Sequence, residues 1–162
     1  MLKKSCKVYL ASGWFNPKQK AQMEEIYEVL SDMEKVGHIE LFAPFWDGIV
    51  LKKEDPNLKK KMRVVWTLDI AMVKESHLVV AATQDHDVGT IFECGYASAN
   101  KVPIVCYNSN PELGLNVMLA QEAVGFCKTK EDLRDAVLDF VKNAPNKDRY
   151  QWRWNIWQGE PI

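Results

Sequence analysis

One carboxylate lies at the start of a helix that follows a short apolar run. Residues 77–82, HLVVAA, are rich in β-branched side chains and predict a strand covered on both faces of a parallel sheet. After a polar loop, Val88 opens a predicted helix for which Asp87 is a good N-cap. Glu93 lies in this otherwise apolar helix start. Open α/β sheets bind ligands just beyond the carboxyl end of such a strand, so Glu93 is a candidate functional residue.

The rest of the chain alternates between strand-like and helix-like segments. Strands are predicted at 7–11, 39–42, 77–82, 102–107 and 123–127. Helices are predicted at 17–35, 56–75, from 88 onward and after Thr129, with one helical turn at 115–120 and a loop at 43–55. This order predicts an α/β fold, a doubly wound parallel five-stranded sheet with helices on both faces.

Composition restricts the classes of function. The chain has 162 residues and a net charge of −1, so it predicts one globular domain without the basic surplus typical of nucleic-acid binding. No apolar segment reaches the roughly 18 residues that a membrane span needs. The four cysteines have no metal-ligand spacing and predict buried thiols in a reducing compartment. We therefore expect a cytoplasmic protein without a metal site.

The C-terminal tail, residues 143–162, carries three tryptophans and has no clear periodicity. Exposed together, Trp152, Trp154 and Trp157 would form a large apolar patch. We expect them to dock on this domain or on a neighbouring subunit, and we treat residues 1–162 as a single domain whose tail docks at a subunit interface.

Several motifs, in their order and spacing, resemble those of the nucleoside 2-deoxyribosyltransferase family. They are VYLASGWFNP at 8–17, TLDIAMVKE at 67–75, DVGTIFECGYA at 87–97, LGLNVM at 113–118 and WQGEPI at 157–162. The resemblance implies a flavodoxin-like fold, a homo-oligomer, no metal and no organic cofactor. It also implies the transfer of 2-deoxyribose from a 2′-deoxynucleoside to a free purine or pyrimidine base through a covalent glycosyl-enzyme.

In that resemblance Glu93 is the nucleophile. An ionised carboxylate near C1 of the sugar traps an oxocarbenium-like centre as an ester, and a second base then displaces it with net retention. The simpler interpretation, an exposed helix glutamate, conflicts with the apolar surroundings, because uncompensated burial of a carboxylate costs several kcal/mol. Tyr9 would hydrogen-bond Glu93 and hold it in line. From its strand position alone, packing in the core is the alternative for Tyr9.

The resemblance assigns Asp69 and Asp87 to holding and protonating the departing base. Proton delivery to a poor leaving group contributes roughly two to four orders of magnitude in rate. Asp87 is equally well explained as a plain N-cap, and Asp69 as a solvent-exposed residue of an amphipathic helix. Which of the two passes the proton is left open.

The first loop is a candidate wall for the base. Gly13 lets the backbone approach a ligand, and Trp14 and Phe15 are suited to stacking; the alternative is a hydrophobic plug at the sheet edge. Gly89, in the motif that carries Glu93, is a further candidate substrate-binding residue. The loop lacks a GxGxxG pattern, which favours nucleosides over nucleotides.

A second loop holds Phe45, Trp46 and Asp47, where some family members place an amide that reads the base edge. We include all three as candidate substrate-binding residues. Asp47 would accept hydrogen bonds from an exocyclic amine, or it is a turn residue. Preference for purines or pyrimidines, and tolerance of ribonucleosides or 5′-phosphates, do not follow from these residues.

Three further residues match positions that, in the family, complete the neighbouring subunit's site. Asn116 matches an asparagine that contacts the sugar 5′-hydroxyl, Met118 lies in the same motif, and Ile162 supplies a terminal carboxylate. The number of subunits does not follow from the sequence.

Two other functions compete with transfer. One is a deoxyribonucleoside or 5′-monophosphate N-glycosidase, in which water replaces the acceptor base. The other is a non-catalytic flavodoxin-like ligand-binding domain.

Overall fold

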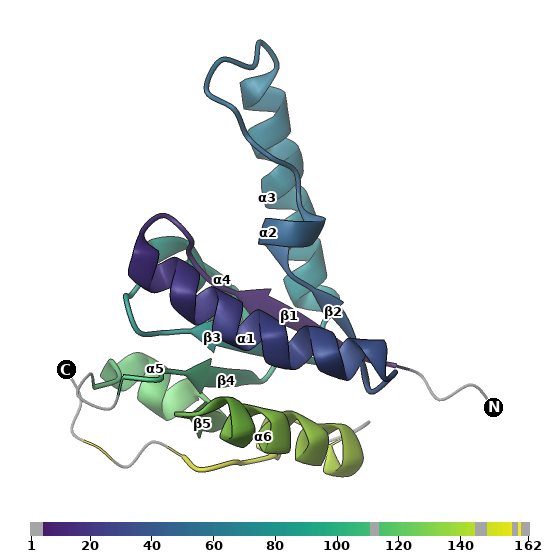
Figure 1. Ribbon diagram of the computed structural model, residues 1–162, viewed down its shortest axis with the longest axis vertical. Helices are drawn as coiled ribbons and strands as arrows, with labels where there is room; N and C mark the ends of the chain where they lie inside the picture. Colours follow the sequence, from purple (N-terminus) through teal and green to yellow (C-terminus); the bar gives the residue numbers. More distant parts are fainter. Residues whose placement is uncertain (1–4, 111–113, 145–148, 157–158, 160–162) are drawn as a thin grey trace.

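The structure, a computed structural model, describes residues 5–110, 114–144, 149–156 and 159 (Figure 1). Its centre is a sheet of five parallel strands in the order β2-β1-β3-β4-β5. The strands are β1 (Cys6–Ala11), β2 (Ile39–Phe42), β3 (Leu78–Ala82), β4 (Ile104–Tyr107) and β5 (Gly125–Cys127). The strand order reverses between β1 and β3, which pair side by side. A crevice at such a reversal is where doubly wound sheets bind ligands.

Helices cover both faces of this sheet, as the sequence predicted. They are α1 (Pro17–Lys35), α2 (Pro44–Asp47), α3 (Leu58–Glu75), α4 (Val88–Ala99), α5 (Val117–Glu122) and α6 (Lys130–Asn143), with a 3-10 turn, η1, at Arg149–Gln151. One core layer joins the sheet to α1 and α6. The other joins it to α3, α4 and α5.

Side-chain alternation along β1 decides which residues face the candidate site. Val8 and Leu10 belong to the core layer under α1 and α6. Tyr9 and Ala11 belong to the layer under α3 and α4. Because successive side chains of a strand point to opposite faces, Tyr9 is directed toward the helix that carries Glu93.

The segment after β2 differs from the sequence prediction of a loop at 43–55, because it contains the single helical turn α2. Pro44 occupies the first helical position, and the Asp47 carboxylate accepts the Ala43 N–H at 2.7 Å, which closes the turn. Gly48 ends it by donating its N–H to the Pro44 carbonyl at 2.9 Å.

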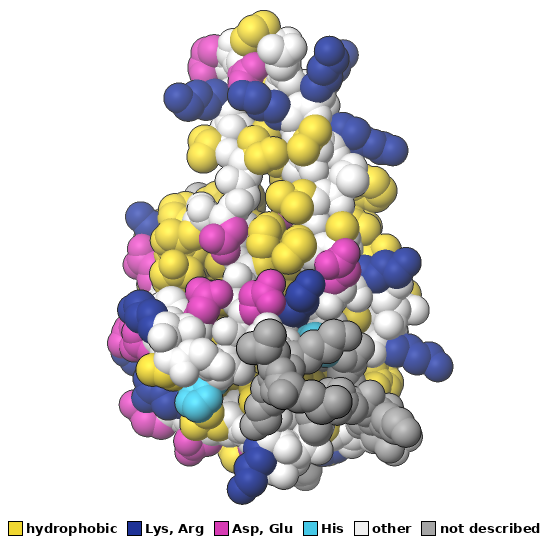
Figure 2. Space-filling view, turned by 90° about the vertical axis from the view of Figure 1, so that its right-hand side faces the viewer, with side chains coloured by type: hydrophobic (Ala, Val, Ile, Leu, Met, Phe, Trp, Pro, Cys, Tyr) yellow, Lys and Arg dark blue, Asp and Glu magenta, His cyan; other side chains and the backbone are white. Residues whose placement is uncertain are grey.

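Beyond α2 the chain leaves the body of the protein. We call residues 49–65, the loop after α2 and the first half of α3, the arm; it projects from the body (Figure 1). Its apolar side chains include Val50, which is 70% exposed. Hydrophobic side chains gather along the arm and at its base, with Lys and Arg at its tip (Figure 2).

The described part of the tail packs against its own chain. Trp154 forms a parallel bridge with Gly125 of β5, and its indole N–H donates to Asp132 at 2.9 Å. Trp152 packs edge-on against Phe140 of α6. Trp157 lies outside the described residues, and a role of the tail at a subunit interface stays a prediction.

The four cysteines are free thiols. Over the described ranges, no helix has the length and apolar content to cross a membrane.

Candidate active site

The centre of the site is a hydrogen bond between a strand tyrosine and a helix carboxylate. The hydroxyl of Tyr9, fully buried on β1, donates to Glu93 Oε1 at 2.6 Å. Burial raises the pKa of Glu93 to about 8; the Tyr9 hydrogen bond opposes this rise, and the charges of Asp69 and Asp87 add to it. Burial also raises the pKa of Tyr9, so this hydroxyl stays protonated and remains a donor.

Asp87 begins α4 beside this pair. Its Oδ2 accepts the backbone N–H of Thr90 at 2.8 Å and the Thr90 hydroxyl at 3.0 Å, so the predicted N-cap is present. A side chain on Gly13 would place Cβ 2.8 Å from the Asp87 Cγ and 2.6 Å from Gln19 Oε1. Glycine therefore lets the first loop close onto the Asp87 and Gln19 side chains, which a larger residue would displace. Gly89 is next to the same carboxylate, since its added Cβ would lie 3.1 Å from Oδ2.

Asp69 lies on α3 and is partly buried. Its charge raises the pKa values of both Tyr9 and Glu93, which places it in their electrostatic neighbourhood. Burial raises the pKa of Asp69 itself to about 6. Asp69 is therefore part of this cluster of ionisable groups and not a fully solvated helix residue.

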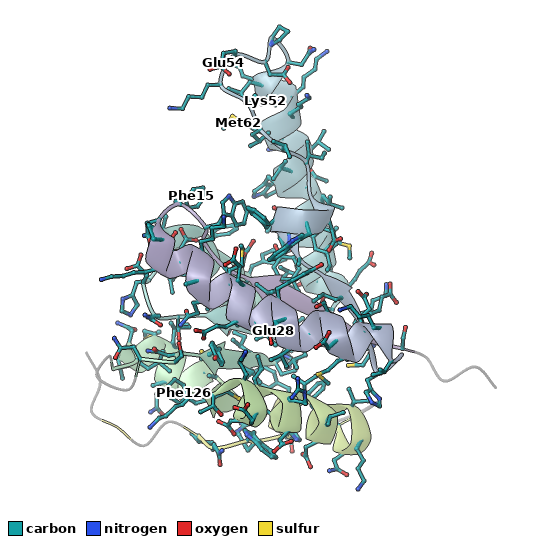
Figure 3. All side chains as sticks on the ribbon, in the orientation of Figure 1. Phe15, Glu28, Lys52, Glu54, Met62 and Phe126 are labelled. Carbon is teal, nitrogen blue, oxygen red and sulfur yellow. The ribbon has the colours of Figure 1, made fainter. Side chains whose placement is uncertain are left out.

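Asp69 also lines a cavity of about 580 Å³. We call it the aromatic cavity. Its other principal walls are Trp14, Phe15, Phe45, Val65 and residues 49–51 of the arm. The Trp14 ring packs edge-on against Phe45 with centroids 5.5 Å apart and lies 5.3 Å from the Phe15 ring. Phe15, which is 74% exposed, stands at the edge of the body that faces the arm (Figure 3).

Two predicted base-contacting residues point elsewhere. Trp46 stacks on Tyr27 of α1 with ring centroids 3.5 Å apart. Asp47 uses its carboxylate to close α2 through the Ala43 N–H. Neither is among the described residues that line the aromatic cavity.

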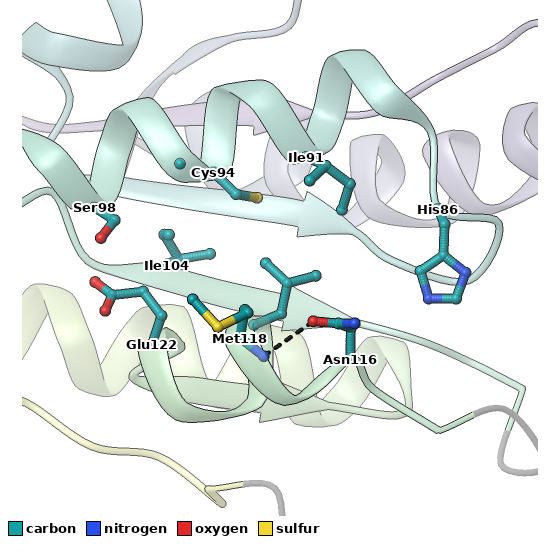
Figure 4. Close-up of a pocket in the computed structure, with 10 residues that line it drawn as sticks. His86, Ile91, Cys94, Ser98, Ile104, Asn116, Met118 and Glu122 are labelled. Carbon is teal, nitrogen blue, oxygen red and sulfur yellow. Dashed lines mark hydrogen bonds between the residues drawn. The ribbon is translucent and has the colours of Figure 1, made fainter. Parts of the chain in front are cut away.

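Asn116 and Met118 lie at a different cavity of about 650 Å³, between α4 and α5 (Figure 4). Asn116 caps α5 by accepting the Met118 N–H at 3.0 Å. The α4 residues that line this cavity are Ile91, Cys94, Gly95 and Ser98, a helical i, i+3, i+4, i+7 face that does not include position 93. Within one chain, the structure therefore does not bring Asn116 and Met118 to Glu93. Ile162 lies outside the described residues.

Sequence reasoning missed the polar contacts that tie the loop after β3 to α1. Gln22, 3% exposed, donates to Gln84 Oε1 at 2.8 Å and accepts the Gln84 N–H at 3.0 Å. Asn16 donates to Asp85 at 2.6 Å. The available signal was an amide beside Met23 on the apolar face of a predicted helix, where a polar side chain needs a partner. These contacts fix the loop that leads to Asp87.

Within the part of the chain that the structure describes, no group of three or more His, Cys, Asp or Glu side chains is placed to hold a metal ion.

Comparison with known proteins decides the family. The model of the nucleoside 2-deoxyribosyltransferase family matches residues 8–140. The chain belongs to this family. The match includes Tyr9, Asp69, Asp87, Glu93 and Asn116, and membership in the nucleoside 2-deoxyribosyltransferase family supports an enzyme that acts on nucleosides. No curated protein matches the chain.

Solved structures agree on the fold. A 2-deoxyribosyltransferase from Bacillus psychrosaccharolyticus matches with a TM-score of 0.65 and 20% identity, over 80% of this chain and 91% of that one. A conserved protein from Enterococcus faecalis V583 matches with a TM-score of 0.60 and 19% identity, over 82% and 97%. At these identities the likeness shows the nucleoside 2-deoxyribosyltransferase fold alone.

Proposed function

We propose that the protein transfers 2-deoxyribose between nucleobases by a retaining double displacement through a covalent deoxyribosyl-Glu93 ester. The observation that carries the proposal is the hydrogen bond of 2.6 Å between Tyr9 and Glu93. Asp69 interacts electrostatically with this pair and also lines the aromatic cavity. This reaction needs an oriented carboxylate nucleophile, a proton donor and a binding site for a planar base.

In the first step, the Glu93 carboxylate attacks C1′ as the C1′–N bond breaks and the base leaves with the bonding electron pair and a proton. In the second step, the ring nitrogen of an incoming base attacks C1′, the bond between C1′ and the Glu93 oxygen breaks, and its electron pair returns to the carboxylate. The proton of the incoming base passes to the carboxylate that protonated the first base. Tyr9 orients one carboxylate oxygen, which leaves the other for attack. Positive charge developing on the sugar favours ionised Glu93 in the transition state.

We assign proton delivery to Asp69. Its pKa of about 6, raised by burial, is close to neutral, as a general acid requires. The Asp87 carboxylate accepts two hydrogen bonds from Thr90, so we assign it the positioning of α4 and of the first loop. Gly13, Trp14, Phe15, Phe45 and Gly89 then form the surroundings of the base and its leaving nitrogen.

The pKa values of Glu93 and Asp69 predict that the active protonation state is a minor one. At pH values between about 6 and 8, Glu93 and Asp69 together hold one proton, and it resides mostly on Glu93. The reactive arrangement, with Glu93 ionised and Asp69 protonated, is then a minor form of the free protein. Substrate must therefore bind this form selectively.

We further propose that the working enzyme is a homo-oligomer. Asn116 and Met118 lie at the cavity between α4 and α5, away from the face of α4 that carries Glu93. Their expected contact with the sugar 5′-hydroxyl would then be made in the site of a neighbouring subunit. Met118, 76% exposed in the single chain, is available for this contact.

A base-exchange assay tests the proposal. A deoxynucleoside is incubated with and without a second free base, and products are separated by chromatography. We expect a new deoxynucleoside in the presence of the second base and little free deoxyribose. Equal release of free sugar in both incubations would indicate an N-glycosidase instead.

Variants connect this activity to the site. Glu93→Gln should abolish exchange. Glu24→Gln is the matched control, because Glu24 is an exposed acid of α1 in a surface ion pair with Lys20; it should exchange at the parent rate.

A further inference from the structure

The side chains that line the aromatic cavity are mostly apolar. Among the described side chains that line it, the polar groups are the Asp69 carboxyl and the Trp14 indole N–H. The remaining side chains are aromatic or aliphatic: Phe15, Pro44, Phe45, Val65 and residues 49–51. A base bound here can stack on aromatic rings, and few of these side chains can hydrogen-bond a polar edge of the base.

Among the described side chains that line this cavity, the charged group is the Asp69 carboxyl. Asp69 raises the pKa values of Tyr9 and Glu93 through its charge, so this part of the wall lies in the neighbourhood of the nucleophile. In the proposed reaction this carboxyl serves the nitrogen at the glycosidic bond. It is then engaged and does not read the opposite edge of the base.

The arm forms another wall of the cavity. Ile49, Val50 and Leu51 line it and are 39%, 70% and 42% exposed, so they offer apolar surface that a ligand would cover. Two neighbouring residues that the sequence offered for reading a base edge make other contacts: the Asp47 carboxylate accepts the Ala43 N–H, and the Trp46 ring stacks on Tyr27.

We propose that this enzyme prefers bases whose outer edge, remote from the glycosidic nitrogen, is apolar, such as alkylated heterocycles, over bases with amino or oxo groups there. The inference rests on the proposed function, because it takes the aromatic cavity as the base subsite. An amino or oxo group that a bound base places against these apolar side chains loses hydrogen bonds to water and gains none from the side chains, whereas an alkyl group gains by burial.

Three purines of nearly equal size test the inference: 6-methylpurine, adenine and hypoxanthine, which carry a methyl, an amino and an oxo group on the outer edge. As acceptors, 6-methylpurine should exceed both others in kcat/KM by about tenfold, the effect of one unpaired buried polar group. A 6-ethyl substituent should add about fourfold for its extra methylene. Equal or higher kcat/KM for adenine or hypoxanthine would overturn the inference.

Dissociation constants of the same free bases, measured by calorimetry, separate this inference from the proposed function. If no base is exchanged, the transferase proposal fails, but tighter binding of 6-methylpurine than of adenine still supports the apolar edge. Binding in the opposite order, or no binding of any of these bases, overturns the inference whatever the exchange assay shows.

A pair of substitutions at one wall position sharpens the test. Phe45→Gln places an amide in the wall and should reduce the preference for 6-methylpurine over adenine by about tenfold. Phe45→Leu keeps the wall apolar and should keep that preference, although overall affinity falls. Phe45 is 41% exposed, so both variants are expected to fold, which their thermal unfolding would verify. An unchanged preference in Phe45→Gln would show that this wall does not face the base edge.

Discussion

The hydrogen bond between Tyr9 and Glu93 leads to a quantitative prediction about the pH dependence of activity. Tyr9→Phe removes the donor that lies 2.6 Å from Glu93 Oε1 and leaves the ring in place. A hydrogen bond to a charged group contributes about 1.5–3 kcal/mol, so its loss should raise the pKa of Glu93 by about one to two pH units. Since Glu93 must be ionised to attack, the active population near pH 7 should fall about 10- to 100-fold.

The pH profile of kcat/KM for base exchange shows whether this reasoning holds. The active form has Glu93 ionised and Asp69 protonated, and their pKa values of about 8 and about 6 predict a bell with limbs near these values. Because the proton resides mostly on Glu93, the alkaline limb reports Glu93. Tyr9→Phe should lower kcat/KM on the plateau and on the acid side of the bell and move the alkaline limb upward, with the pKa of the acid limb unchanged.

A second tyrosine provides the matched control. Tyr107→Phe removes a buried strand hydroxyl that donates to Glu25 at 2.8 Å in the other core layer, under α1. This variant should keep both limbs of the bell in place. If Tyr9→Phe kept kcat/KM within threefold of the parent and left the alkaline limb in place, the role assigned to this hydrogen bond would be refuted.

Three other substitutions test the remaining parts of the site. Asp69→Asn should lower kcat/KM by about two to four orders of magnitude. It should also remove the decline of kcat/KM at alkaline pH, because no general acid remains to lose its proton. A bell-shaped pH profile that kept its shape would contradict the assignment of Asp69 as the acid. Glu93→Gln should raise the melting temperature more at pH 9 than at pH 4. The reason is that the pKa of Glu93, about 8 when folded against 4.5 ordinarily, gives stability that is present below pH 4.5 and is lost as the pH rises toward 8; an equal change at both pH values would show that burial does not disfavour the carboxylate. Gly13→Ala should lower kcat/KM by at least about tenfold, because its Cβ would lie 2.8 Å from the Asp87 Cγ, and a parent-like kcat/KM would show that the first loop can shift at no cost to the chemistry.

Much of the fold follows from local signals in the sequence. The buried run at Leu78–Ala82 and the caps Asn16, Asp87 and Thr129 are present in the structure where the pattern places them. Parallel strands covered on both faces leave little ambiguity in such a pattern. The doubly wound sheet and the family membership are accordingly confirmed.

The details of the site depend on contacts between distant segments. Strand alternation cannot tell which helix Tyr9 faces, and that pairing spans 84 positions along the chain. The orientations of Trp46 and Asp47 depend on one helical turn that Pro44 and Gly48 enclose, too short for a periodic signal. The projection of the arm follows from packing of α3 on the body, which has no local signature.

The position of Asn116 shows a further limit. A single chain places it at a cavity on the other face of α4 from Glu93, so its predicted contact with the sugar requires a second subunit. The family resemblance of the motif at 113–118 predicts that relationship, and a single folded chain does not contain it.

The covalent intermediate is the claim on which the mechanism depends, and mass spectrometry can observe it. A deoxynucleoside donor with fluorine at C2 of the sugar slows both displacements by destabilising the oxocarbenium-like transition states, which allows the ester to accumulate. We predict that the intact protein gains the mass of one fluorinated sugar, located on the peptide that contains Glu93 and lost when a second base is added. Continued turnover of this donor with no adduct on residue 93 would contradict the mechanism.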